Sequence, residues 1–480
     1  MRAAVLLVTA ALVLAALTLL APSSPSYDPF AWIVWGRELM PGAGGEPFTL
    51  AGGPSWKPLP VLFTTPFALA GDAAPALWLL LARAGLLLAL AGAFALGRRL
   101  GGLVAGAVAA IALLLLADLV SLAWRGGSEP LLLAALLWAC ERHLADRRSV
   151  AFALGVAAAL IRPELTLFLG LYALWQWRHA GARERAILVA GLALVPLLWI
   201  GVPALAGDPL AASTTARNPG TRTTVGSALR GDLRLALAIV WALALAAVVL
   251  RSQERPVRAL ALGALAWLGL LSAMAAGGYA SPARYGMPAA ACACVLAGVG
   301  VAALTERVRE RAATSARGRA GAIAWIAGGL ALAALLATPV VPRVALLTDQ
   351  VREGTAVARS NEQLRAAIDA AGGPASLRGC ALGGWVAVNH TTQSALAWEL
   401  HADLGHVART MSRPGLLVRA PRSAAAGAPP TVTLRPVPRT DVVARAGAWT
   451  VLAVGAAGEP FPHVCDMRKA SGPARRIPNI

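Results

Sequence analysis

The chain has 480 residues, of which 58% are hydrophobic and only 14% are charged, and its mean hydropathy is +0.64. Soluble domains carry about 25% charged residues, so this composition excludes an ordinary water-soluble protein. The net charge of +19 does not indicate nucleic-acid binding, because the arginines lie in short gaps between apolar blocks.

The apolar blocks have the length of membrane helices, each of which needs about 20 residues to cross a bilayer. With a cytoplasmic N-terminus, the inward gaps hold about twice as many basic residues as the outward gaps, as the positive-inside rule predicts. The sequence therefore predicts a multi-pass protein of the inner (plasma) membrane with an extracytoplasmic C-terminus. The expected spans, about eleven, are 3–21, 75–97, 102–119, 128–144, 150–161, 164–177, 186–206, 233–250, 257–277, 285–305 and 320–341.

The first block, 3–21, also resembles a secretory signal, because Pro22-Ser23-Ser24 follows it. Its apolar run is longer than the 7–15 residues typical of a signal core, which favours an uncleaved first span.

The first outer loop, 22–74, contains more than a connector. Pro29 suits the first position of a helix and Asp28 suits the N-cap before it, so a helix is expected as far as Leu39. Its aromatic residues predict that it lies in the membrane interface. A second apolar piece, Leu59–Leu69, is too short to span and is expected to dip into the outer leaflet.

The composition changes after residue 342. We expect an all-α polytopic bundle over 1–342, a small extracytoplasmic α/β domain over 343–467, and a disordered basic tail over 468–480. Cys380 and Cys465 both fall in the outer part, where a disulfide is chemically permitted, and the sequence leaves their pairing open. The expected helix is Asp349–Ala371, and the expected strands are Cys380–Val388, Gly415–Arg419, Thr431–Pro436 and Ala448–Gly455.

Ionisable residues near the outer ends of spans are the candidates for function, because burying them in a membrane is costly. Asp28 is either a helix N-cap or a general base beside a lipid-embedded substrate. Each of the others alone is compatible with snorkelling to the head groups. Together they predict a site that binds a phosphate in lipid. These other candidates are Lys57, Arg125, Glu129, Arg162, Glu164 and Arg284.

Other chemistries have little support in the sequence. The histidines are not near the loop that carries Asp28, and no glycine motif of the nucleotide-triphosphatase type is present. A flippase or transporter of a lipid-linked saccharide would use similar basic residues, but such proteins commonly have pseudo-symmetric halves, and no repeat is visible. A non-catalytic envelope scaffold is the third alternative.

Over roughly 1–341 the order of the motifs resembles the GT-C class of polyprenyl-phosphate-sugar-dependent glycosyltransferases. More narrowly, it is similar to the mannosyl-, arabinosyl- and aminoarabinosyltransferase-like proteins of bacterial envelopes. The motifs that carry this resemblance are Tyr27-Asp28, Trp35-Gly36-Arg37-Glu38, Lys57-Pro58-Leu59, Ser128-Glu129-Pro130-Leu131, Arg162-Pro163-Glu164 and Arg284-Tyr285.

The resemblance implies that Asp28 is the catalytic base and that Tyr27 and Tyr285 join the cations in binding substrate. It implies a polyprenyl-phosphate-linked sugar as donor and an envelope glycan, lipid or protein as acceptor, with inversion at the anomeric carbon. Many members have two adjacent acidic residues in this loop, whereas Pro29 follows Asp28 here. We therefore expect no cofactor, and a divalent metal is not favoured.

Overall fold

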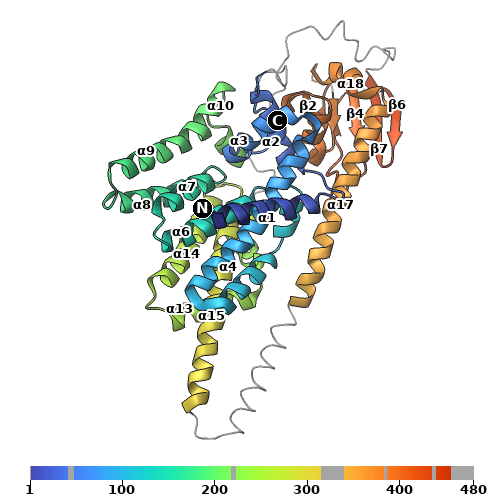
Figure 1. Cartoon of the computed structure of the whole chain (residues 1–480). Coiled ribbons are helices and arrows are strands. Elements are labelled where there is room, and N and C mark those ends of the chain that lie inside the picture. The colour runs from blue at the N-terminus through green and yellow to red at the C-terminus, as the bar shows by residue number, and fades with distance from the viewer. Residues whose placement is uncertain are drawn as a thin grey trace.

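A computed structural model describes residues 2–41, 48–217, 223–314, 340–382, 386–434 and 439–455. Helices form the chain as far as residue 314, and a mixed α/β domain follows from residue 340 (Figure 1). The long helix α17 (Val340–Ala370) runs along one flank of the helical part and packs against the sheet at its far end. The structure thus has a helical part as far as residue 314 and an α/β part from residue 340, which keeps the name outer domain here; its side of the membrane stays a prediction.

The first outer loop folds into the helices α2 (Tyr27–Leu39) and α3 (Pro58–Phe67), which follow α1 (Arg2–Thr18). Every residue of α2 from Pro29 to Arg37 is buried. A Cβ atom on Gly36 would lie 2.5 Å from the Thr64 backbone, so α3 packs directly against the backbone of α2. The helix α3 and the outer domain pack against α2, so most of its aromatic side chains are buried in protein; its position at the membrane interface stays a prediction.

The helix α4 (Ala74–Leu114) is interrupted by a tight turn at Gly101-Gly102, where Gly102 has φ +82°. A Cβ atom on Gly106 would lie 2.6 Å from the Phe94 carbonyl oxygen. In a continuous helix these residues would be about 18 Å apart along the axis, so the two pieces fold back as a hairpin. The break agrees with the predicted boundary between the spans 75–97 and 102–119.

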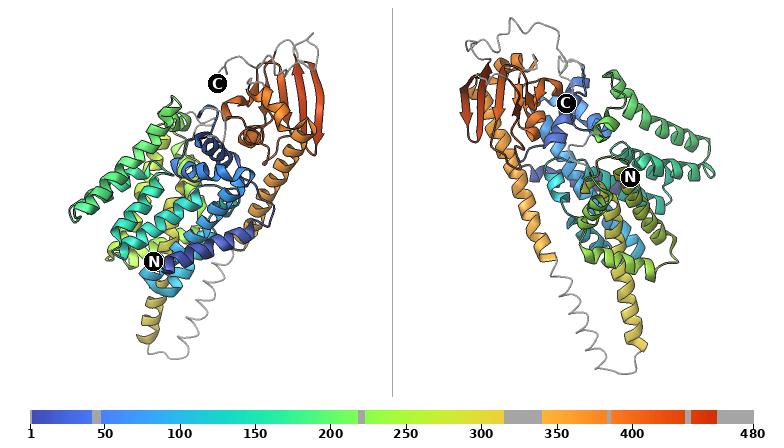
Figure 2. Two further views of the ribbon diagram at one scale, coloured as in Figure 1. Left: turned by 45° about the horizontal axis from the view of Figure 1, so that its top comes forward. Right: turned by 180° about the vertical axis from the view of Figure 1, so that it is seen from behind.

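The short helix η1 precedes α4, and the remaining helices of the bundle follow α4 in short succession. In Figure 2 the green helix α9 lies at the edge far from the sheet domain. The predicted pair of short helices around Arg162-Pro163 is present as α7 and α8. These elements are η1 (Ala68–Ala73), α5 (Leu119–Trp124), α6 (Glu129–Leu144), α7 (Arg148–Ala159), α8 (Leu165–Trp177), α9 (Ala182–Pro196), η2 (Leu197–Gly201), α10 (Val202–Leu205), α11 (Ala211–Arg217), α12 (Val225–Leu235), α13 (Ala238–Leu250), α14 (Arg255–Ala276), η3 (Ala283–Gly286) and α15 (Met287–Thr314).

The prediction of eleven spans is not confirmed. In the described part of the chain, four helical segments are long and apolar enough to cross a membrane, or five when α12 and α13, bent by 86°, count as one. Several predicted spans are too short, because α1, α7 and α8 have 17, 12 and 13 residues against the roughly 20 required. The predicted span 320–341 lies almost entirely outside the described residues, and only its last two positions belong to α17.

The outer domain has a five-stranded sheet in the order β2-β1-β4-β7-β6. Strands β1, β2 and β4 are parallel, whereas β7 is antiparallel to β4 and β6. A separate parallel pair joins β3 and β5. The elements are α18 (Gly373–Leu382), β1 (Val386–Val388), η4 (His390–Thr392), α19 (Gln393–Glu399), η5 (Leu404–His406), β2 (Val407–Ala408), β3 (Thr410–Met411), β4 (Gly415–Arg419), β5 (Thr431–Val432), β6 (Arg439–Ala446) and β7 (Trp449–Gly455).

Two strand predictions need correction. Cys380 belongs to the helix α18 and not to a strand, so the expected strand Cys380–Val388 shrinks to Val386–Val388. The expected strand Thr431–Pro436 ends at Val432. The strands β2, β3 and β6 were not predicted. Cys380 carries a disulfide bond. Cys465, whose pairing with Cys380 the sequence left open, and the expected tail 468–480 lie outside the described residues.

Candidate active site

Glu129 is the centre of a buried cluster of charges. It begins α6 with a side chain that is 2% exposed, and its Oε1 atom lies 3.8 Å from Lys57 Nζ and 3.5 Å from an Arg162 nitrogen. The Nε atom of Arg284 lies 3.7 Å from the same oxygen. Lys57 also donates a hydrogen bond of 2.9 Å to Ser128 Oγ. The one carboxylate of Glu129 therefore contacts three positively charged side chains, which its single negative charge does not neutralise.

Asp28 closes the cluster on its open side. The guanidinium of Arg284 donates a 3.0 Å hydrogen bond to Asp28 Oδ2. Their side chains are 22% and 37% exposed, so this pair forms the rim above the buried Glu129. Asp28 is not the N-cap: that position is Ser26, and α2 makes no side-chain capping bond. The structure thus brings Asp28, Lys57, Glu129, Arg162 and Arg284 together.

The two predicted tyrosines have different surroundings. The guanidinium of Arg162 lies 3.3 Å from the ring centroid of Tyr285, beside the charged cluster. Tyr27 instead donates a 3.2 Å hydrogen bond from its hydroxyl to the Gly52 carbonyl of the first outer loop, with Gln393 Oε1 of the outer domain 3.5 Å away. Tyr285 is therefore part of the cluster, whereas Tyr27 flanks it next to Asp28.

Two predicted site residues lie outside the cluster. Arg125 forms a 3.1 Å ion pair with Glu353 of α17, so it ties the helical part to the outer domain. Glu164 makes no ion pair in the described part of the chain, and its buried Oε2 atom lacks a hydrogen bond there. The structure gives neither residue a place beside Glu129.

Burial changes the proton affinity of two side chains next to the cluster. It lowers the pKa of Lys57 to about 8, against the opposing attraction of Glu129. It raises the pKa of Tyr27 to about 12, and Arg409 of the outer domain partly offsets this shift. Lys57 is therefore a cation that can lose its charge at moderately alkaline pH, whereas Tyr27 stays neutral.

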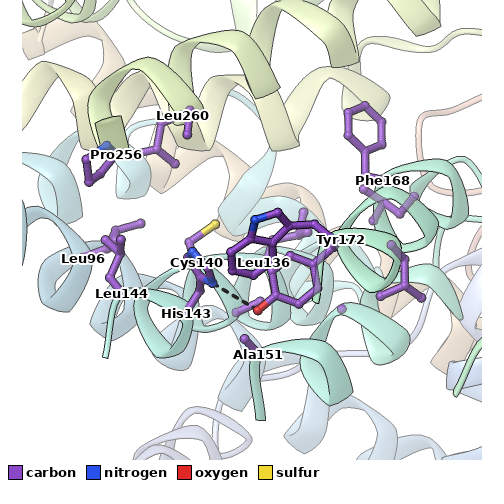
Figure 3. A pocket seen from close by; sticks show the side chains of 16 residues that line it. Leu96, Leu136, Cys140, His143, Leu144, Ala151, Phe168, Tyr172, Pro256 and Leu260 are labelled. Carbon is purple, nitrogen blue, oxygen red and sulfur yellow. Dashed lines mark hydrogen bonds between the residues drawn. The ribbon is translucent and has the colours of Figure 1, made fainter. Parts of the chain in front are cut away.

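An apolar cavity inside the bundle reaches Trp267, which contacts Tyr285 next to the cluster; no charged residue of the cluster lines it. Its upper part, about 200 Å³, is lined by Trp267, whose Nε1 donates a 2.8 Å hydrogen bond to the Tyr285 carbonyl. Its lower part, about 410 Å³, lies between α6, α8 and α14 (Figure 3). Both parts share lining residues, including Phe168 and Ala259. The only hydrogen bond drawn there joins His143 to Tyr172, at 3.1 Å.

Among the described residues, no group of three His, Cys, Asp or Glu side chains lies close enough together to hold a metal ion.

Sequence reasoning missed the residues that attach α2 to the outer domain. Arg37 is buried and donates a 2.9 Å hydrogen bond to the Ala402 carbonyl. Ser394 Oγ donates a 2.6 Å hydrogen bond to the Tyr27 carbonyl. Arg37 stood in one of the quoted motifs, but Ser394 lies 367 residues from its partner, and no local pattern points to it.

No protein-family profile matches the chain, and no curated protein sequence matches it significantly. Among solved structures, its arrangement is the GT-C glycosyltransferase fold. ArnT from Cupriavidus metallidurans bound to undecaprenyl phosphate has a TM-score of 0.55 at 18% identity, covering 95% of this chain and 99% of ArnT. Apo ArnT gives 0.54 at 17% identity, covering 94% and 98%.

An Archaeoglobus fulgidus oligosaccharyltransferase tethered with an acceptor peptide also matches, at 15% identity and a TM-score of 0.42. It covers 72% of this chain and 55% of the oligosaccharyltransferase. This likeness is too weak to support a conclusion about the present chain.

Proposed function

We propose that the protein is a membrane glycosyltransferase that moves a sugar from a polyprenyl-phosphate donor to an envelope glycan, lipid or protein. The reaction takes place on the outer face of the membrane, and the C-terminal domain is extracytoplasmic. The observation that carries the proposal is the position of Asp28 at the rim of three cations that converge on Glu129, near an apolar cavity that Trp267 lines.

The charge balance of the cluster suits a lipid-borne phosphate. Its five ionisable side chains carry three positive and two negative charges, and Lys57 and Arg162 are almost completely buried. Such cations stabilise charge that develops on a leaving phosphate, particularly where water is excluded. The apolar cavity next to Tyr285 accepts the first isoprene units of the donor. The ArnT structure with the same fold was solved with undecaprenyl phosphate, which supports this class of donor.

The proposed step is a single displacement. The acceptor hydroxyl oxygen attacks the anomeric carbon while Asp28 takes its proton, and the bond between that carbon and the phosphate oxygen breaks. The released polyprenyl phosphate stays in the membrane next to Lys57, Arg162 and Arg284. The configuration at the anomeric carbon is inverted. The proposal needs no divalent metal, because Pro29 stands where a second acid would support one.

The test is transfer by purified protein with a panel of polyprenyl-phosphate sugars and envelope acceptors, comparing Asp28→Asn with Asp72→Asn. Asp72 is an exposed acid of the same outer loop and is absent from the cluster. Asp28→Asn is expected to lower transfer by at least 100-fold with donor binding retained, the scale of losing a general base. Asp72→Asn is expected to leave it unchanged. Full activity in Asp28→Asn would reject this residue as the base.

A further inference from the structure

Two residues of the outer domain, His390 and Arg409, come just after the ends of two neighbouring parallel strands. β1 ends at Val388 and β2 ends at Ala408, and the two strands pair in parallel, with Val386 opposite Val407. Their carboxyl ends therefore meet at one edge of the sheet, which is where open α/β sheets bind ligands. The residues that emerge at this edge are His390 and Arg409.

The two side chains form a basic pair that faces solvent. Arg409 Nη1 lies 2.6 Å from His390 Nε2, and both residues are exposed. Partial burial and the charge of Arg409 lower the pKa of His390, so the neutral imidazole accepts the hydrogen bond. Arg409 makes no ion pair with a carboxylate in the described ranges of the chain. Its guanidinium thus has donors left for an anion from solution.

This pair lies beside the helix that carries Asp28. The sequence prediction that no histidine lies near the loop carrying Asp28 is wrong, because the rings of His390 and Tyr27 are 5.8 Å apart and Tyr27 directly precedes Asp28. Residues so distant in the sequence meet only through the contact between the outer domain and α2. The bond from Ser394 to the Tyr27 carbonyl fixes the start of α19 against α2, only a few residues after His390. The sheet edge is therefore held next to the residue that precedes the proposed base.

We propose that His390 and Arg409 form an acceptor subsite that binds an anionic group, a phosphate or a carboxylate, of the acceptor glycan or lipid. The assignment rests on the proposed function, because it places the acceptor hydroxyl at Asp28. The planar fork of an arginine matches the oxygens of either anion with two parallel hydrogen bonds. Tyr27 and His390 provide ring faces between the anion and the base. The donor phosphate binds at the cluster around Glu129.

The test measures binding of three soluble probes to the full-length protein in detergent, by saturation-transfer NMR and calorimetry. The probes are glucose 6-phosphate, glucuronate and glucose. Glucose 6-phosphate or glucuronate is expected to bind at least about tenfold more tightly than glucose, the scale of one charge-assisted hydrogen bond. The anion that binds more tightly identifies the acceptor group as phosphate or carboxylate.

Arg409→Gln is expected to abolish the preference for the anionic probe, and Arg413→Gln to retain it. Arg413 is an exposed arginine of the same domain and serves as the matched control. Asp28→Asn is expected to leave probe binding intact, so an error about the base does not affect this result. Equal binding of all three probes to the wild type, or an unchanged preference in Arg409→Gln, would overturn the assignment.

Discussion

Replacing Glu129 with glutamine probes the charged cluster most sharply. The substitution keeps the shape of the side chain but removes the one carboxylate shared by Lys57, Arg162 and Arg284. The net charge of the five-residue cluster rises from one to two positive charges, with Lys57 and Arg162 less than 10% exposed. Breaking a buried ion pair by removing one partner costs about 3–5 kcal/mol. We expect Glu129→Gln to unfold at a clearly lower temperature than the wild type.

Added polyprenyl phosphate is expected to restore more stability to this variant than to the wild type, because its phosphate replaces the missing negative charge. The assay is thermal unfolding in detergent with and without polyprenyl phosphate. The control is Glu141→Gln, which removes a buried carboxylate of the same helix that pairs with Arg99 and lies away from the cavity rim. Polyprenyl phosphate should stabilise Glu141→Gln no more than it stabilises the wild type. An equal response in both variants would refute the idea that the cluster binds phosphate.

Three further predictions concern the donor, the outer domain and the cavity. Lys57 is a cation below its pKa of about 8 and neutral above it, so kcat/KM for the donor should fall as pH rises through that value. Lys57→Arg should move the decrease in kcat/KM to higher pH. If the pH profile of this variant is the same as that of the wild type, another group causes the decrease. Ser394→Ala should lower kcat several-fold without raising the donor KM, because the Tyr27 carbonyl loses its tie to the outer domain. The exposed Ser376→Ala should change neither, and equal kinetics for both serine variants would rule out a positioning role. Ala259→Trp should fill the apolar cavity and raise KM for long-chain donors more than for short-chain donors. A uniform change across chain lengths would place the donor tail elsewhere.

Local sequence signals located the parts of the site that local chemistry determines. Pro29 after Asp28 predicted the start of a helix, and α2 begins at Tyr27. The Arg162-Pro163 break predicted the turn between α7 and α8, which brings Arg162 to Glu129. The energetic cost of burying a charge in a membrane was a sound guide, because most of the ionisable residues selected for that reason lie together around Glu129.

Other features depend on contacts that no local pattern encodes. Burial of α2 depends on α19, more than 350 residues away, so its aromatic composition alone suggested a membrane surface. An apolar block also does not distinguish a helix that spans lipid from a short one packed inside protein, so the count of about eleven spans stays a prediction. The strand β6 lies at the edge of the sheet with most of its described side chains at least partly exposed, and it lacks the apolar signature of a buried strand.

The central claim is that the cations around Glu129 hold the phosphate of a lipid-linked donor. An experimental structure of the protein with bound polyprenyl phosphate tests it most directly. The account predicts phosphate oxygens within about 3 Å of Lys57 Nζ and the Arg284 guanidinium, with the isoprene chain entering the cavity beside Trp267. A phosphate bound away from both side chains, with the cluster closed over Glu129 as in the free protein, would contradict it.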